Sequence, residues 1–203
     1  HPRHIALPRG CFDEAVEVLT EHGAQAELDD QRSDGTPLPN TVQFLGELRP
    51  PQQRAFESLT GHDTGVLAAT TAFGKTVVAS ALIGHRARNT LVLVHRRELL
   101  DQWVERLKTF LQIDPKLIGT IGGGRRKPTG VIDVALIQSL VRNGEVDDIV
   151  ADYGQVIVDE CHHLSAASFE LVARRTKARY VVGLSATVAR KDGHHPIIFM
   201  QCG

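Results

Sequence analysis

Residues 65–80 read GVLAATTAFGKTVVAS, in which two apolar runs flank a turn that ends in Gly-Lys-Thr. A strand, a turn of small residues and a helix that opens with Lys-Thr are typical of a phosphate-binding loop. Backbone N–H groups at such a helix start surround a β-phosphate, the lysine reaches the β and γ oxygens, and the threonine hydroxyl binds Mg²⁺. We therefore expect ATP and Mg²⁺ as cofactors. The predicted nucleotide contacts are Thr71, Ala72, Phe73, Gly74, Lys75 and Thr76, with Thr76 also a metal ligand.

The loop departs from the usual pattern at three positions. Ala69 and Ala72 stand where glycines are common, and the bulky Phe73 lies beside Gly74. If Ala72 had to adopt a positive φ, the strain would cost roughly 1 kcal/mol, which a bound triphosphate would offset. The alternative is a chance Gly-Lys-Thr in an ordinary turn.

A pair of carboxylates follows a second apolar run in QVIVDECHHL (155–164). Two adjacent acids at the end of a buried strand are costly unless a cation lies beside them. Asp159 is therefore a candidate Mg²⁺ ligand, and Glu160 is then available to polarise an attacking water, which favours hydrolysis over transfer. The alternative is a zinc site made of Cys161, His162 and His163. It is disfavoured because consecutive residues of one element do not all converge on one metal.

The elements that must position these residues alternate between short apolar runs and amphipathic stretches. This alternation predicts an α/β domain with a mainly parallel sheet. The helix expected over 96–111 has one apolar stripe, which we assign to the core and not to a cofactor site: Leu99, Leu100, Trp103, Leu107 and Phe110. Another helix is expected over 75–87, and the predicted strands are 66–69, 90–94, 116–121, 131–137, 155–159 and 180–184.

The first 40 residues have a different pattern. A strand candidate at 4–7, helical spacing of apolar residues over 12–23 and an alternating run at 24–30 predict a small β-α-β extension over 1–34. The turn formers GTPLPN (35–40) predict a linker. We thus expect an accessory unit and linker over 1–40 and the main domain over 41–203. Since the first residue is not Met, we expect the chain to be part of a longer protein.

The totals narrow the class of protein. No apolar run approaches the roughly 18 residues that a membrane span needs, and three scattered cysteines make no disulfide framework. A reducing cytoplasm is expected, with no membrane partner. Residues 1–47 hold 9 acidic and 3 basic residues, and 48–203 hold 15 acidic and 20 basic ones. An anionic partner would therefore meet local basic clusters, which are Arg86/Arg88, Arg96/Arg97, Arg125/Arg126/Lys127 and Arg190/Lys191.

The ordered set of motifs resembles superfamily 2 helicases of the DExH type. Asp159-Glu160-Cys161-His162 is followed by Ser185-Ala186-Thr187 at the end of the next strand. The set is most similar to the branch shared by repair and transcription helicases, phage recombination helicases and restriction-enzyme motor subunits. Within it, LRPPQ (48–52) resembles the adenine-reading motif, which implies that Gln52 contacts the base. LVLVHRRELLDQW (91–103), IQSL (137–140) and GLSATVARKDG (183–193) resemble further motifs.

The resemblance implies the first RecA-like domain of an ATP-dependent DNA helicase or translocase. A second RecA-like domain of the same parent chain would supply an arginine finger, worth roughly 10³–10⁵ in rate, so this domain alone should hydrolyse ATP poorly. The partner implied is DNA bound without sequence preference, with RNA possible. A restriction-type double-strand translocase and a nucleotide-gated binding module with vestigial ATPase remain alternatives. The implied catalytic residues are Lys75, Asp159, Glu160, His162, Ser185 and Thr187, and the implied nucleic-acid contacts are Arg96, Arg97, Gln138 and Ser139.

Overall fold

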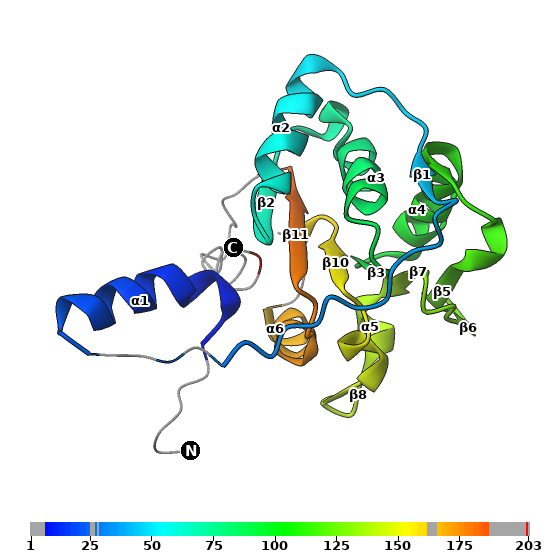
Figure 1. Ribbon diagram of the computed structural model, residues 1–203. Helices are drawn as coiled ribbons and strands as arrows, with labels where there is room; N and C mark the ends of the chain where they lie inside the picture. Colours follow the sequence, from blue (N-terminus) through cyan, green and yellow to red (C-terminus); the bar gives the residue numbers. More distant parts are fainter. Residues whose placement is uncertain (1–6, 25–26, 28, 162–165, 187–201, 203) are drawn as a thin grey trace.

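A seven-stranded sheet forms the centre of the computed structural model, which describes residues 7–24, 27, 29–161, 166–186 and 202 (Figure 1). The strand order is β2-β11-β10-β3-β7-β5-β6, and every neighbouring pair is parallel except β5 and β6. The six predicted strands are therefore confirmed. The strands are β2 (Thr64–Ala68), β3 (Thr90–Val94), β5 (Ile118–Gly122), β6 (Arg125–Lys127), β7 (Ile132–Leu136), β10 (Gln155–Val158) and β11 (Tyr180–Ser185).

Strand β6 was not predicted, because its three residues are all basic and read as a loop. It pairs antiparallel with β5 across a turn in which Gly122, Gly123 and Gly124 all have positive φ. An edge strand can be short and charged, since only one of its sides needs a partner and charge discourages pairing with another chain.

Helices cover both faces of the sheet, and each face has its own apolar core. Alternate strand residues point to opposite faces: Val92 and Val94 belong to one core, and Leu91 and Leu93 to the other. The first core is closed by α2 (Pro50–Thr60), α3 (Lys75–Arg86) and α4 (Arg97–Phe110), and the second by α5 (Ile137–Leu140) and α6 (Ala166–Arg175). Two small antiparallel pairs complete the domain: β1 (Gln43–Phe44) with β4 (Leu111–Gln112), and β8 (Val141–Arg142) with β9 (Glu145–Val146). Among the described residues, no helix has the length and apolar character that crossing a membrane requires.

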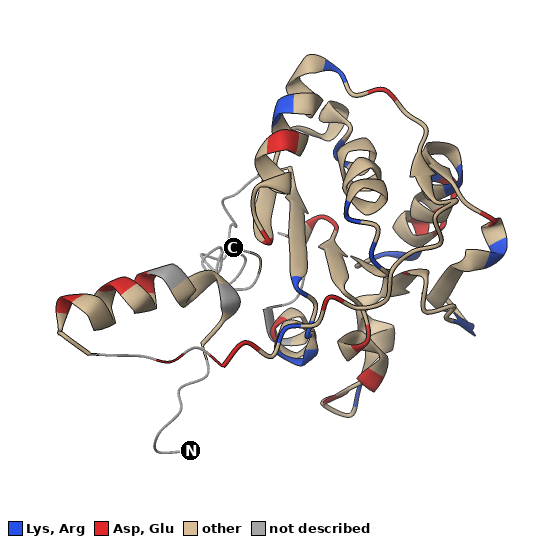
Figure 2. Ribbon diagram, viewed as in Figure 1, with Lys and Arg blue, Asp and Glu red and all other residues tan. Residues whose placement is uncertain are grey.

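The N-terminal extension is only partly as expected. Its helix is present as α1 (Phe12–Glu21) and lies to one side of the sheet (Figure 1). The flanking strands expected at 4–7 and 24–30 lie largely outside the described residues, and the described positions 7, 24, 27, 29 and 30 are not in a strand. Phe12 and Val18 remain 42% and 54% exposed, and acidic residues recur along the same helix (Figure 2).

The segment expected as a linker is packed against the amino-terminal ends of the strands. Ser33 N donates to Lys177 O at 2.6 Å, Arg179 N donates to Ser33 O at 2.9 Å, and Leu38 is only 4% exposed. A Cβ at Gly35, whose φ is +61°, would lie 2.3 Å from Gly154 N. Glycine is thus required where this strap, residues 30–38, crosses the start of β10.

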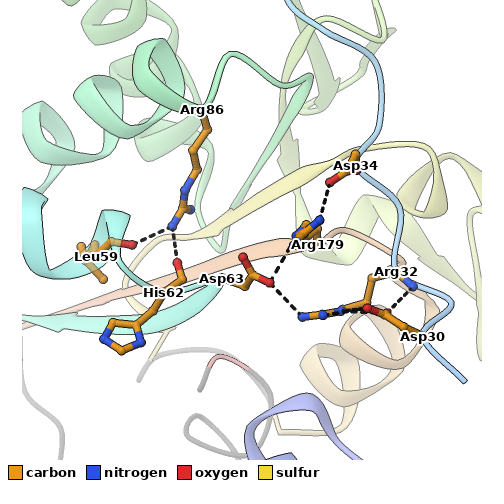
Figure 3. Close-up of polar contacts among 8 residues, drawn as sticks. All are labelled: Asp30, Arg32, Asp34, Leu59, His62, Asp63, Arg86 and Arg179. Atoms are coloured by element: carbon orange, nitrogen blue, oxygen red, sulfur yellow. Dashed lines mark hydrogen bonds and ion pairs between the residues drawn. The ribbon is translucent and has the colours of Figure 1, made fainter. Parts of the chain in front are cut away.

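Ion pairs hold the strap to the loop before β2 (Figure 3). Asp63 Oδ2 accepts from Arg32 Nη1 at 3.1 Å and from Arg179 Nε at 3.2 Å, and Arg179 Nη1 reaches Asp34 Oδ1 at 3.3 Å. The charges of the strap are therefore paired with the main domain. Because these side chains are exposed or partly exposed, each ion pair by itself contributes little to stability, and Arg32 and Arg179 share Asp63.

Arg86, which the sequence placed in a basic cluster for an anionic partner, has a structural role instead. Its Nη2 donates to the carbonyls of Leu59 and His62, both at 2.9 Å, and its guanidinium lies 4.5 Å from the centroid of the Tyr180 ring (Figure 3). Burial lowers the pKa of Arg86 to about 10. The Arg86 side chain is thus engaged in contacts within the protein and is not available to an anion.

Asn89 is the polar centre of the amino-terminal edge, with a side chain 4% exposed. Its Oδ1 accepts from Thr36 N at 2.9 Å and from Gly154 N at 3.0 Å. Its Nδ2 donates to Asp152 O at 3.0 Å and to Gly130 O at 3.2 Å. One amide therefore joins the strap, the start of β10 and the loop before β7.

We expect Asn89→Ala to lower the free energy of unfolding by about 3 kcal/mol, because it leaves several buried backbone groups without partners. Chemical denaturation measures the change. The matched control is Asn40→Ala, at an exposed asparagine, which should cost no more than about 0.5 kcal/mol. Equal stability of the two variants would contradict the role of Asn89.

Candidate active site

The sheet brings the predicted catalytic segments together at the carboxyl ends of its parallel strands. Strand β11 lies between β2, which precedes the phosphate loop, and β10, which precedes the acidic pair. Ala69 N donates to Ser185 O at 2.9 Å, and Asp159 N donates to Leu93 O at 2.9 Å. Ligands of open α/β sheets bind at this edge.

The phosphate loop forms a 3-10 turn over Thr71–Phe73 and then enters α3. Gly74 has φ +86° and ψ 43°, and a Cβ there would lie 2.6 Å from Gln52 Nε2. Ala72 is not among the residues with positive φ. The strain that the sequence suggested at Ala72 is therefore absent, because Gly74 makes the left-handed turn in its place.

Two side chains from the start of α2 fasten the loop. Gln52 Nε2 and Arg49 Nη2 both donate to Phe73 O, at 2.8 and 2.6 Å, and Gln52 Oε1 accepts from Arg49 N at 2.9 Å. Gln52, expected to contact a base, is 3% exposed and makes both of these contacts within the chain. Arg49 was missed, although it lies in the quoted LRPPQ motif.

Lys75 and Glu160 form an ion pair across the site. Lys75 Nζ lies 3.5 Å from Glu160 Oε1 and donates to Ala69 O at 2.9 Å. The lysine side chain is 5% exposed and the glutamate 19%. Glu160 has φ +45°, an uncommon conformation for a residue with a side chain. Such strain of about 1–3 kcal/mol is typical of functional sites.

Asp159 is nearly buried, at 7% exposure, and both carboxylate oxygens accept hydrogen bonds. Trp103 Nε1 donates to Oδ2 at 2.7 Å, and Glu160 N donates to Oδ1 at 3.0 Å. Burial raises the pKa of Asp159, and the Trp103 hydrogen bond opposes that rise. Trp103 was predicted as core, and it is 2% exposed in the core, but its polar contact was not foreseen.

The oxygen atoms at this edge suit a hard cation such as Mg²⁺. Asp159 offers its carboxylate, and the half-buried Thr76 lies in the first turn of α3. In the described part of the chain, no three His, Cys, Asp or Glu side chains cluster as a metal cage would require. Mg²⁺ is usually held by one or two protein oxygens together with substrate phosphates.

The remaining catalytic candidates are only partly described. Ser185 is 1% exposed at the end of β11, while His162, His163 and Thr187 lie outside the described residues. Cys161 is fully buried, and burial raises the pKa of its thiol to about 12. Of the alternative zinc site made of Cys161, His162 and His163, only Cys161 lies within the described residues.

The predicted nucleic-acid contacts lie on neighbouring elements of the same edge. Arg96, Arg97, Gln138 and Ser139 are all exposed. Gln138 Nε2 donates to His95 O at 3.0 Å, which joins the start of α5 to the end of β3. Arg97 lies against the β5–β6 turn, where a Cβ on Gly123 would be 3.1 Å from Arg97 Nε.

We expect Gly74→Ala to distort the phosphate loop, since it adds a positive-φ penalty of about 1–2 kcal/mol and a clash with Gln52. Nucleotide affinity by calorimetry and the thermal midpoint should both fall. Gly61→Ala, at a glycine with φ −74° and no atom within 3.4 Å of an added Cβ, is the control and should leave nucleotide affinity near that of the parent. A Gly74→Ala variant with parental affinity would show that the loop does not need this turn.

The chain was compared with known proteins. A family model described as "Type III restriction enzyme, res subunit" matches residues 45–190. The DNA 3'-5' translocase XPB2 of Sulfurisphaera tokodaii is 30% identical over 173 residues, covering 85% of this chain and 38% of that protein. The DNA 3'-5' helicase XPB of Mycobacterium tuberculosis is 29% identical over 177 residues, covering 84% of this chain and 32% of that protein.

Solved structures share the fold at low sequence identity. The UvsW helicase of bacteriophage T4 aligns with a TM-score of 0.74 at 17% identity, covering 96% of this chain and 76% of that one. The Sulfolobus solfataricus SWI2/SNF2 ATPase core in complex with dsDNA aligns with a TM-score of 0.58 at 17% identity, covering 83% and 38%. The chain spans roughly a third of the length of these curated relatives. With the family model matching most of its length, the chain belongs to the type III restriction enzyme res-subunit family and has the RecA-like fold of a helicase motor domain.

Proposed function

We propose that this chain is the ATP-binding and ATP-hydrolysing motor domain of an ATP-dependent DNA helicase or translocase. The observation that carries the proposal is the meeting of the phosphate loop and the acidic pair, where Lys75 Nζ lies 3.5 Å from Glu160 Oε1. A phosphate-binding cation and a carboxylate able to polarise water are thereby held at one edge of the sheet.

The roles follow from where each group lies. Lys75 binds the β and γ oxygens of ATP, with the N–H groups of the loop from Thr71 to Thr76 around the phosphates. Glu160 takes a proton from the attacking water, and ATP releases it from its ion pair by competing for Lys75. Ser185, and Thr187 and His162 by their motifs, connect this site to the nucleic-acid edge. Gln52 holds the loop and approaches the base.

Mg²⁺ would be held by Asp159 and Thr76 together with the phosphates, and when bound it neutralises charge on the β and γ oxygens. The carboxylate of Asp159 is kept in one orientation by its two hydrogen bonds. A second RecA-like domain of the same parent chain would add the arginine finger. That addition is why hydrolysis by this domain alone should be slow.

The nucleic acid is proposed to be DNA bound through its backbone, with RNA a possible substrate. Support comes from the translocase and helicase names of the relatives and from the dsDNA complex of one structural neighbour. We further propose a cytoplasmic protein in which residues 1–40 form an accessory unit, attached through the strap, and residues 41–203 form the motor domain.

Two alternatives differ in what the ATP energy does. A restriction-type motor would translocate along double-stranded DNA without separating the strands, which the family description favours. A nucleotide-gated binding module with vestigial ATPase would need no intact acidic pair, so the contact between Lys75 and Glu160 argues against it.

The acidic pair gives the test of the proposed function, in protein that contains both domains. Glu160→Gln should retain Mg·ATP binding and lower kcat by about 10²–10⁴, because the amide cannot accept the proton of water. Lys75→Ala should weaken nucleotide binding itself by about 10- to 100-fold, the effect of a lost charged hydrogen bond.

Glu47→Gln, at an exposed glutamate far along the chain from either motif, is the control and should hydrolyse ATP at the parental rate. ATP hydrolysis by Glu160→Gln at the parental rate would show that Glu160 does not take the proton from water. Stimulation of the parent's ATPase by single-stranded DNA, duplex DNA or RNA distinguishes the substrates.

The nucleic-acid edge gives a separate prediction. Replacing Arg96 and Arg97 by Ala should flatten the dependence of log affinity on log salt by up to about two units for duplexes, or about 1.4 for single strands. The loss should be equal on unrelated sequences, because phosphate contacts do not read bases. Titration of labelled strands at several salt concentrations measures the slope.

Arg106→Ala with Lys108→Ala removes the same charge from exposed positions near the other end of α4 and serves as the control. In the described residues Asp101 pairs with Arg125 at 3.8 Å, and neither Arg96 nor Arg97 has an ion pair. Equal slopes for the two double variants would show that Arg96 and Arg97 are ordinary solvated residues that do not contact phosphates.

A further inference from the structure

Trp103 is the only tryptophan of the 203 residues, and its indole is directed at the carboxylate of Asp159. It lies in the middle of α4 among the apolar residues of the first core, with 2% of its surface exposed. A leucine or phenylalanine would fill such a position without a polar atom. An indole adds one N–H, and here that N–H lies 2.7 Å from Asp159 Oδ2.

The contact fixes how Asp159 can act. Trp103 occupies Oδ2 from the core side, and the N–H of Glu160 lies 3.0 Å from Oδ1. The carboxylate plane is thus held between a helix and its own backbone. Oδ1 keeps further acceptor capacity at the edge of the sheet, since a carboxylate oxygen has two lone pairs.

Burial alone does not require this arrangement. Asp159 is 7% exposed and lies near the amine of Lys75, so charge compensation is available without Trp103. The hydrogen bond instead removes rotational freedom from the side chain. Groups that hydrogen-bond to a metal-binding carboxylate typically raise metal affinity 10- to 100-fold, because they orient the ligand.

We propose that Trp103 is a positioning residue for Mg²⁺: its indole N–H holds Asp159 so that Oδ1 faces the metal that accompanies the nucleotide. The inference rests on the proposed function, since it takes Asp159 as a Mg²⁺ ligand. It adds a residue that acts on the metal from the core, through α4 and not through the acidic segment itself.

The test is the Mg²⁺ dependence of ADP binding to the 203-residue chain, measured by calorimetry. Trp103→Phe keeps an aromatic ring and loses the N–H, and it should raise the Mg²⁺ concentration for half-maximal effect by about tenfold. Affinity for ADP in EDTA should be unchanged, because the Trp103 indole N–H donates to Asp159 and not to the phosphate loop. A loss of packing alone would lower the thermal midpoint without moving the Mg²⁺ midpoint.

Leu107→Ala is the matched control for packing. Leu107 is fully buried in the same core, one turn further along α4. It should lower the thermal midpoint as much as Trp103→Phe or more, and leave the Mg²⁺ midpoint at the parental value. The same Mg²⁺ midpoint in Trp103→Phe and the parent would overturn the proposal.

Fluorescence of the parent chain decides the question even where Trp103→Phe does not fold. All tryptophan emission comes from Trp103, so Mg²⁺·ADP should change the emission relative to ADP with EDTA. Identical spectra at saturating ADP would overturn the proposal. Absence of any ADP binding by calorimetry would instead overturn the proposed function, so the two failures are distinguishable.

Discussion

A carboxylate that is almost completely removed from water, that of Asp159, constrains the rest of the site. Taking an ionised group out of water is costly unless hydrogen bonds and opposite charge compensate it. The chain supplies both: the Trp103 indole on one oxygen, the Glu160 N–H on the other, and the Lys75 ammonium nearby. Each donor comes from a different part of the sequence. The order of the strands and the packing of α4 must therefore be right before the acidic pair can exist in its charged form.

The two edges of the sheet differ in backbone strain and in the contacts of their polar groups. At the carboxyl edge, Glu160 has a positive φ, and under the proposed function its ion pair with Lys75 opens when phosphate binds. At the amino edge, the Asn89 amide and the Asp63 carboxylate each have several partners, whereas Arg86 Nη1 and the amide atoms of Gln155 are buried without a hydrogen bond among the described residues. The favourable contacts at the amino edge can offset the backbone strain of Glu160 at the carboxyl edge. Arg86 lies at this amino edge, where two backbone carbonyls and the Tyr180 ring contact its guanidinium group.

The sequence was enough for features that depend on neighbours along the chain. Apolar runs located the six strands, and the local order of small and charged residues located the phosphate loop and the acidic pair. Three structural features could not be predicted from the sequence. The position of β11 between β2 and β10 depends on pairing between distant segments. The Trp103–Asp159 contact joins residues 56 apart, and an apolar helix stripe gives no sign of it. The short edge strand β6 is made of three basic residues, whose composition indicates a loop and gives no sign of pairing with β5.

Helix α4 joins the proposed nucleic-acid contact Arg97 to Trp103, which donates to the proposed metal ligand Asp159. Arg97 opens the helix and lies against the β5–β6 turn, and Trp103 lies six residues further on. At a rise of about 1.5 Å per residue, the two positions are separated by roughly 9 Å along a rigid element. A phosphate backbone bound at Arg97 and a metal bound at Asp159 would therefore act on the same helix. Any displacement of α4 alters the length or angle of the indole hydrogen bond, and hydrogen bonds weaken steeply with misalignment. If both proposed sites bind their ligands, we expect Mg²⁺ affinity and nucleic-acid affinity to be coupled, and such coupling is reciprocal.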